Sequence, residues 1–151
     1  PTISPFNAWV LMKSLETIAL RVERQAENAA AIAAWLENRP GVVKMRYPGL
    51  ESHPQHALAR RQMSNGGTLL AFTVEGGRQA AFRALNALKL IDISNNLGDS
   101  KTLACHPAST THSSVGAAER AEMGIDEGSI RISVGLEDVE DLKADLDAAL
   151  A

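Results

Sequence analysis

The sequence predicts an α/β domain in which helices pack on one face of a small sheet. Two observations support this class: apolar residues at helical spacing alternate along the chain with short β-branched runs, and proline and glycine turns separate the two kinds of segment. The length of 151 residues is enough for one domain with a buried core. Strand directions stay open, because the short connections allow antiparallel as well as parallel pairing.

The first element is expected to be a long helix over residues 5–38. Ser4 can cap its first turn with a hydroxyl, and Pro5 has no amide hydrogen to leave unpaired. Apolar residues recur every three or four positions from Met12 onward, until Pro40-Gly41 ends the pattern. Because an average globular helix has only about 11–12 residues, we expect this one to pack also on another domain or subunit. A long core helix with a kink is the alternative.

The remaining elements are shorter and lie between turn-forming residues. Apolar, β-branched runs predict strands, and stretches rich in alanine and leucine predict helices. The expected strands are Val42–Tyr47, Thr68–Val74, which should be central, Leu90–Ile93 and Ser129–Val134; the expected helices are Pro54–Met63, Ala80–Leu88 and Val139–Leu150. No sustained period runs through residues 95–116, which predicts a long loop that is functional or disordered.

Composition and charge argue against several classes of protein. With 45% hydrophobic and 22% charged residues, the chain has the composition of an ordinary globular protein. Its net charge of −3 is spread without blocks, which argues against nucleic acid or an acidic membrane as a partner. No apolar run approaches the roughly 20 residues that span a bilayer. The first residues lack the pattern of a secretion signal and begin without methionine, so we expect a truncated, cytoplasmic protein.

The segment from Ser94 to His112 gathers amides, hydroxyls and imidazoles in a chain otherwise rich in alanine and leucine. Such a loop offers donors for a polar or anionic ligand, whereas its histidines lack the spacing of a helical metal pair, so no metal site is expected. A hydrolase triad of Ser109, His106 and Asp99 is disfavoured, because no Gly-x-Ser-x-Gly turn accompanies it.

Two further residues of the chain could carry chemistry. The single cysteine, Cys105, fits a reducing compartment, and we expect it to be a buried structural residue. It should not pair with His106 as nucleophile and base, because neighbours in a strand point to opposite faces. Arg131 lies between two isoleucines in an alternating strand. That pattern alone leaves two interpretations open: a solvent-facing or salt-bridged arginine, or a bidentate clamp for a carboxylate.

Four ordered sequence blocks carry a resemblance that covers essentially the whole chain. They are Asn96-Leu97-Gly98-Asp99, His106-Pro107-Ala108-Ser109-Thr110-Thr111-His112, Gly124-Ile125 and Ile130-Arg131-Ile132-Ser133-Val134-Gly135-Leu136-Glu137-Asp138. In this order they resemble the Cys/Met-metabolism (transsulfuration) family of enzymes that depend on pyridoxal phosphate (PLP). The family includes cystathionine γ-synthase, methionine γ-lyase and the O-acyl-homoserine sulfhydrylases. The form Ser94-Asn95-Asn96-Leu97-Gly98-Asp99 is most similar to the O-succinylhomoserine sulfhydrylases.

The resemblance implies a fold and a set of site residues. The chain would be the small C-terminal domain of a fold-type I PLP-dependent transferase, with a large PLP-binding domain missing upstream. Arg131 would hold the α-carboxylate of the amino-acid substrate, and Thr111 would line the substrate pocket. Asn96 stands where the family has a serine that contacts the same carboxylate region. An asparagine can still donate a hydrogen bond there, although its side chain is larger.

The resemblance also implies what this chain lacks. The family's Schiff-base lysine sits in a Ser-x-Thr-Lys type motif that is absent here, and none of the five lysines matches it: Lys13, Lys44, Lys89, Lys101 and Lys143. No catalytic residue is therefore assigned to this chain, and alone it is expected to hold no PLP and to be inactive.

The expected function belongs to a longer parent enzyme. That enzyme would make homocysteine from O-succinylhomoserine and sulfide in methionine biosynthesis, as a homotetramer. A related transsulfuration activity is one alternative, and a non-catalytic binding or assembly domain is the other.

Overall fold

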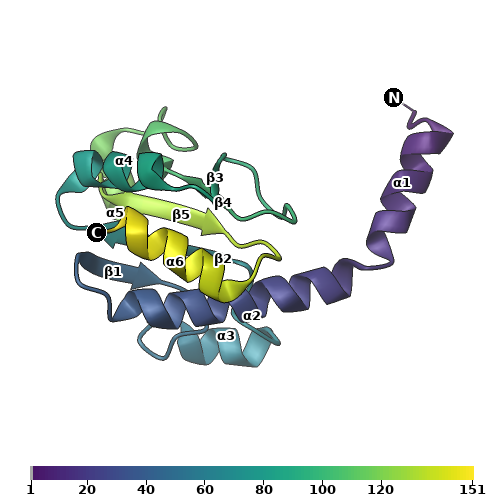
Figure 1. Cartoon of the computed structure of the whole chain (residues 1–151), viewed down its shortest axis with the longest axis horizontal. Coiled ribbons are helices and arrows are strands. Elements are labelled where there is room, and N and C mark those ends of the chain that lie inside the picture. Colours follow the sequence, from purple (N-terminus) through teal and green to yellow (C-terminus); the bar gives the residue numbers. More distant parts are fainter. Residues whose placement is uncertain (1) are drawn as a thin grey trace.

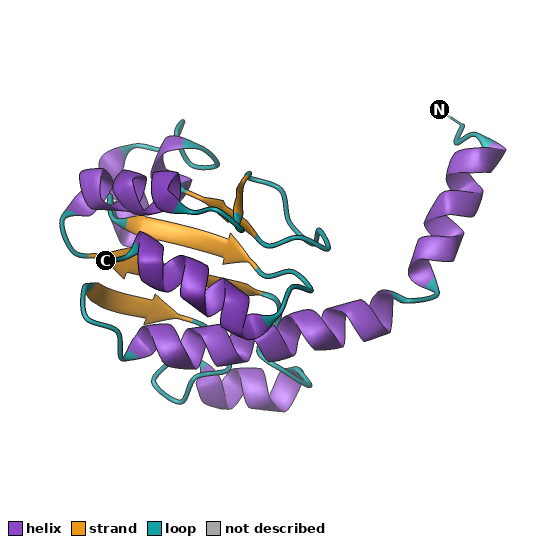
Figure 2. Ribbon diagram, viewed as in Figure 1, coloured by secondary structure: helices purple, strands orange, loops and turns teal. Residues whose placement is uncertain are grey.

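The computed structural model describes residues 2–151 as a five-stranded sheet with a layer of helices across one face (Figures 1 and 2). The strand order is β1-β2-β5-β4-β3. The strands are β1 (Val42–Arg46), β2 (Leu69–Val74), β3 (Asp92–Ile93), β4 (Leu103–Cys105) and β5 (Ser129–Ser133). All neighbours pair antiparallel except β3 and β4, which are parallel. The predicted α/β class with helices on one face is confirmed.

Strand β5, and not the expected β2, occupies the middle of the sheet. β2 lies between β1 and β5, so it is an inner strand but not the central one. Sequence patterns predict how deeply a strand is buried, and both strands are deeply buried on one face. The order of strands instead depends on how the connections cross, which a local pattern does not record.

Three helices form the layer over the sheet: α2 (Ile18–Glu37), α4 (Gly77–Ala87) and α6 (Val139–Ala149). Their apolar faces meet the inward residues of the central strands in one core. Fully buried members of that core include Ile32, Leu36, Phe72, Ile132 and Leu142. The other helices are α1 (Pro5–Leu15), α3 (His56–Gln62), α5 (Ala117–Glu122) and the 3₁₀ turn η1 (Pro107–Ser109).

The expected continuous helix over residues 5–38 is wrong in one respect, because it is broken between α1 and α2 at Glu16-Thr17. Figure 1 shows the chain turning sharply there, with α1 projecting away from the body. The Arg21 side chain donates to the carbonyl oxygen of Ser14 at 2.7 Å, which satisfies a carbonyl near the end of α1. The apolar spacing continues across the break, so periodicity alone could not reveal it. No helix within residues 2–151 is long and apolar enough to cross a bilayer.

The segment 95–116, expected to be an irregular loop, contains two regular elements, β4 and η1. Residues 102–108, which include β4 and the first two residues of η1, are all buried. A three-residue strand is too short to show an alternating period, and this explains the error. The short helix α5, which follows this segment, was also missed, although its alanine- and glutamate-rich sequence has high helix propensity.

Candidate substrate-binding site

Arg131 lies at the centre of the sheet, with its side chain on the face opposite the core. Its neighbours Ile130 and Ile132 are buried among the core side chains, so the alternation of a strand places Arg131 on the other side. Its register partners are Ala71 on β2 and Cys105 on β4. The middle position of β5 therefore fixes the base of this side chain between two neighbouring strands.

The guanidinium of Arg131 reaches the amide-rich segment that leaves β3. Its Nη2 donates to the carbonyl oxygen of Asn95 at 2.9 Å and lies 3.5 Å from that of Asn96. Its Nε is buried without a hydrogen-bond partner. Within residues 2–151 no carboxylate lies within ion-pairing distance of this side chain. Because buried polar groups are rarely left unpaired, the free donors suit an incoming carboxylate.

The turn that faces Arg131 is held in place by hydrogen bonds from two other elements. The amide of Gly98 donates to Ser133 Oγ at 3.0 Å, and Gly98 has the positive φ of +75° that glycine tolerates. The Gln25 amide on α2 donates to the carbonyl oxygen of Asp99 at 2.6 Å. The Asp99 carboxylate accepts hydrogen bonds from the amide of Lys101 and the hydroxyl of Ser100, which lower the pKa of Asp99.

The structure brings only part of the predicted site together. Asn96 meets Arg131 through its backbone carbonyl, and its backbone N–H donates to Ser94 Oγ at 3.2 Å; the residue is exposed. Thr111 is exposed, and its hydroxyl is 2.9 Å from His112 Nδ1. No hydrogen bond joins Thr111 to Arg131 within the part of the chain that the structure covers. Their expected contacts with a substrate stay predictions.

Two contributors to the site were not foreseen, Ser133 and Gln25. Ser133 shares the strand face of Arg131, a relation that the alternation of β5 already implied. Gln25 is a polar residue that is only 4% exposed on the buried side of α2, among the alanines of the core stripe. A polar side chain inside an apolar stripe was therefore the available signal.

The imidazole of His106 is a packing element in this fold. Its Nδ1 lies 2.9 Å from Ser109 Oγ and its Nε2 lies 2.8 Å from the carbonyl oxygen of Glu127. The ring is 2% exposed and stands edge-on against Phe82. Asp99 is bound elsewhere, to Ser100, Lys101 and Gln25, so these contacts assemble no triad.

Cysteine and metal chemistry gain no support from the described residues. Cys105 is a free, buried cysteine, as expected. Residues 2–151 contain no cluster of three or more histidine, cysteine or acidic side chains that could hold a metal ion.

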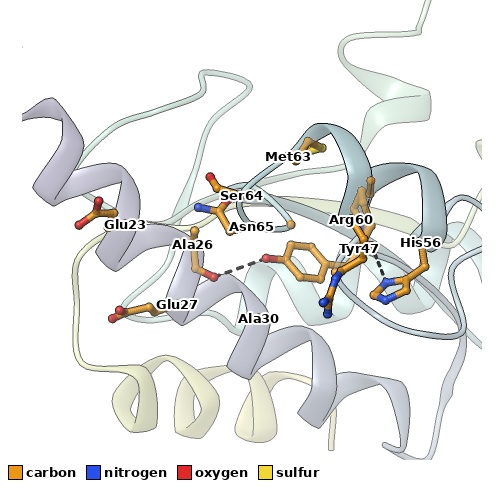
Figure 3. A pocket seen from close by; sticks show the side chains of 14 residues that line it. Glu23, Ala26, Glu27, Ala30, Tyr47, His56, Arg60, Met63, Ser64 and Asn65 are labelled. Carbon is orange, nitrogen blue, oxygen red and sulfur yellow. Dashed lines mark hydrogen bonds between the residues drawn. The ribbon is translucent and has the colours of Figure 1, made fainter.

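Two cavities lie away from the guanidinium itself. One, of about 380 Å³, is lined by Asn95 and Cys105 together with residues of α4. The larger, of about 690 Å³, lies between α2 and α3 around Tyr47 (Figure 3). Glu23 and Glu27 line one side of it, and Arg60 lines the other. None of its lining residues belongs to β5 or to segment 94–112, so it is not part of the candidate site.

The residues present suit a substrate carboxylate but do not suit PLP held through a lysine. Four of the five lysines form ion pairs with carboxylates, and Lys89 is exposed next to α4. No lysine lines either of the two cavities. Within residues 2–151, the feature that suits such a ligand is the partly unpaired guanidinium of Arg131.

Comparison with known proteins places the chain in a family. The model of the "Cys/Met metabolism PLP-dependent enzyme" family matches residues 1–151. The chain belongs to this family. It is 50% identical over its whole length to the O-succinylhomoserine sulfhydrylase of Pseudomonas aeruginosa, and 52% identical over 155 aligned residues to that of Mycobacterium tuberculosis. It is also 49% identical over 98% of its length to the L-methionine γ-lyase of Pseudomonas putida.

Solved structures confirm the family fold. The chain superposes with a TM-score of 0.94 and 38% identity on a Campylobacter jejuni protein described as an O-acetylhomoserine (thiol)-lyase, over 99% of this chain and 36% of that one. With the O-acetylhomoserine sulfhydrylase of Wolinella succinogenes the TM-score is 0.87 at 37% identity, covering 100% and 40% of the two chains. The chain spans about 38% of the length of the first curated relatives that it matches. The family is one of PLP-dependent transsulfuration enzymes, and the activities of the members named here differ.

Proposed function

We propose that this chain is the substrate-binding small domain of a PLP-dependent O-succinylhomoserine sulfhydrylase. The full-length protein would make homocysteine from O-succinylhomoserine and sulfide, and a large domain preceding this chain would hold PLP. Arg131 carries the proposal: its partly unpaired guanidinium stands at the centre of the sheet, and no carboxylate of residues 2–151 forms an ion pair with it. The identities of 50–52% to two O-succinylhomoserine sulfhydrylases support the choice of substrate.

The role of Arg131 in this proposal is to bind and orient. A guanidinium forms two parallel charge-assisted hydrogen bonds with a carboxylate, so it fixes the direction of the amino acid as well as its position. The Asn95 carbonyl accepts one hydrogen of Nη2, and a parallel pair to the carboxylate would use the other Nη2 hydrogen together with Nε or Nη1. The reactive groups at the other end of the substrate then lie where the large domain would act on them.

Two other activities of the family are supported by sequence identities that are almost as high. The identity to methionine γ-lyase of Pseudomonas putida is 49%, and that to O-acetyl-L-homoserine sulfhydrylase 1 of Thermus thermophilus is 47%, so the margin over them is small. The substrates of both alternative activities are amino acids with an α-carboxylate, so Arg131 would have the same role in each. Steady-state rates of the full-length protein with O-succinylhomoserine, O-acetylhomoserine and methionine distinguish them. We expect the highest kcat/KM with O-succinylhomoserine and sulfide.

Replacing Arg131 tests the carboxylate clamp directly. In the full-length protein, Arg131→Ala should lower kcat/KM for the acyl-homoserine by roughly 30- to 5,000-fold, since truncating one partner of a buried charge pair costs about 2–5 kcal/mol. Arg83→Ala, at an exposed position of α4, is the matched control and should change kcat/KM less than about twofold. An unchanged kcat/KM in Arg131→Ala would overturn the assignment.

The quaternary part of the proposal concerns the apolar surface of α1. We propose that the full-length protein is a homotetramer and that other parts of it cover this helix. α1 has no buried residue, and it exposes Phe6, Trp9 and Leu11. Light scattering of the full-length protein measures the assembly, and a monomer would contradict it.

A further inference from the structure

Two buried amides on α2 are not explained by the packing of the core. Gln25 and Asn28 are 4% and 2% exposed, and they lie one helical turn apart on the same stripe as Ala29 and Ile32. A polar side chain in such a stripe destabilises the fold unless its hydrogen bonds are satisfied. Both amides find their partners in distant backbone segments, and these segments lead to the candidate site.

Asn28 holds the chain that leaves β5. Its Nδ2 donates to the carbonyl oxygens of Gly135 at 3.2 Å and of Glu137 at 2.9 Å. The Glu137 carboxylate in turn accepts from the amide and the hydroxyl of Thr102, at 2.6 and 2.8 Å. A side chain at Gly135 would come within 2.5 Å of Ser100 and Lys101 backbone atoms, so this junction is closely packed.

Gln25 holds the turn that faces the guanidinium. Its amide donates to the Asp99 carbonyl at 2.6 Å, three residues beyond the Asn96 carbonyl that Arg131 approaches. From the strand side, the same turn is fixed through Ser133 Oγ and the Arg131 contacts. The backbone amide of Asn96 also donates to Ser94 Oγ, just after β3. The helix layer therefore supports the turn from one side, and β5 supports it from the other.

We propose that Gln25 is a positioning residue for the carboxylate site: it holds the turn Asn96–Asp99 so that the guanidinium of Arg131 keeps its binding orientation. Asn28 fixes the adjoining segment and supports the same arrangement. The proposal rests on the function proposed above. It deepens that function by assigning part of the substrate affinity to a residue of α2 that does not touch the substrate.

Gln25→Met in the full-length protein tests this role, because methionine keeps the bulk of the side chain and removes the amide donor. A mispositioned clamp weakens binding of the carboxylate in the ground state and the transition state alike. We therefore expect the KM for the acyl-homoserine to rise roughly tenfold, with kcat changed less than about twofold. Gln79→Met, at an exposed position of α4, is the matched control and should leave KM unchanged.

Hydrogen exchange provides a readout that does not depend on activity. In Gln25→Met, backbone amides of the peptide covering residues 94–102 should exchange several-fold faster, whereas those of β5 should not change. A merely structural role in the core would accelerate both or lower the melting temperature instead. Unchanged KM together with unchanged exchange in that peptide would overturn the positioning role.

The double variant separates the two proposals. If Gln25 acts through Arg131, adding Gln25→Met to Arg131→Ala should cause no further loss of kcat/KM beyond about twofold. A full additional tenfold loss would show that Gln25 acts by another route and would overturn the inference. If Arg131→Ala itself has no effect, the proposed function fails. If Arg131→Ala is strongly impaired and Gln25→Met is not, only the positioning role fails.

Discussion

The first 24 residues and the rest of the chain use similar amino acids in opposite ways. The N-terminal arm, residues 2–24, exposes nearly every apolar side chain that it has, and α1 buries none. From Gln25 onward the same helical spacing places Ala29, Ile32 and Leu36 at 0% exposure in the core. Apolar periodicity thus indicates that a helix has a face suited to packing. Whether that face is buried depends on whether another element or chain lies against it.

The arm exposes several large apolar side chains along α1. Phe6 and Trp9 lie with ring centroids 6.2 Å apart and remain more than half exposed, together with Leu11, Met12 and Leu15 on the same helix. Monomeric proteins rarely expose apolar patches of this continuity, and larger ones mark contact surfaces. The rest of the chain, residues 25–151 (the body), buries its own core. A substitution in the arm should therefore have a different effect on stability from one in the body.

The largest effect is expected from a matched pair of leucine substitutions, one in the core and one in the N-terminal arm. Leu36→Ala removes a fully buried side chain and should reduce the free energy of unfolding of the chain by about 2–5 kcal/mol. Leu11→Ala acts on a side chain that is 57% exposed and should change it by less than about 0.5 kcal/mol. Urea denaturation followed by circular dichroism measures both. Equal effects would mean that α1 packs on the body in solution.

Gly66→Ala probes how tightly the body is packed around Tyr47. A Cβ at position 66 would lie 2.5 Å from Tyr47 Cζ, and Gly49 approaches the same ring from another position at an equal distance. Because the buried Tyr47 side chain would have to shift to admit this carbon, we expect a loss of about 1–3 kcal/mol in the free energy of unfolding. Gly116→Ala, with nothing near its Cβ position, is the control. A loss of stability in Gly116→Ala alone would contradict the packing argument.

The sequence predicted the body well because each of its long elements carries its own signal. The borders of the helix over 77–87 and of strands β2 and β5 differ from expectation by three residues or fewer. The break at Glu16-Thr17 escaped prediction, because apolar spacing continues through it and the signal is a side-chain contact from Arg21. β4 escaped for a different reason: three residues are too few to show a period.

The candidate site was only partly predictable from the sequence. The resemblance singled out Arg131, and strand alternation indicated which face it occupies. Its pairing with the carbonyl oxygens of Asn95 and Asn96 depends on the path of a loop whose shape no local pattern specifies. The support from Gln25 comes from a helix 74 residues away in the chain, and only the folded structure brings the two together.

The ionisation of Tyr47 provides a spectroscopic test of how well the body is packed, with a smaller expected effect on stability. It is the single tyrosine of the chain, and burial raises the pKa of its phenol above the ordinary value. A raised folded-state pKa means that this contribution to stability is present below the unfolded pKa of about 10 and is lost as the pH rises through the folded value. The tyrosinate absorbance near 295 nm should therefore appear only above pH 10, in the same transition in which the chain unfolds. A reversible transition near pH 10 in the folded chain would show that the ring is accessible.

The fluorescence of Trp9 tests whether the arm is covered in the full-length protein, and this test has the smallest expected effect on stability. The chain has two tryptophans, and Trp35 lies beside the core with the Arg39 guanidinium 5.2 Å from its ring centroid. In a Trp35→Phe variant the remaining emission comes from Trp9, which is 54% exposed in this chain. Acrylamide should quench it readily here. In the full-length protein, where we propose that α1 is covered, the part of the emission that Trp9→Phe removes should be quenched much less. Equal quenching of the Trp9 emission in both proteins would contradict that cover and leave the arm's apolar surface without its proposed partner.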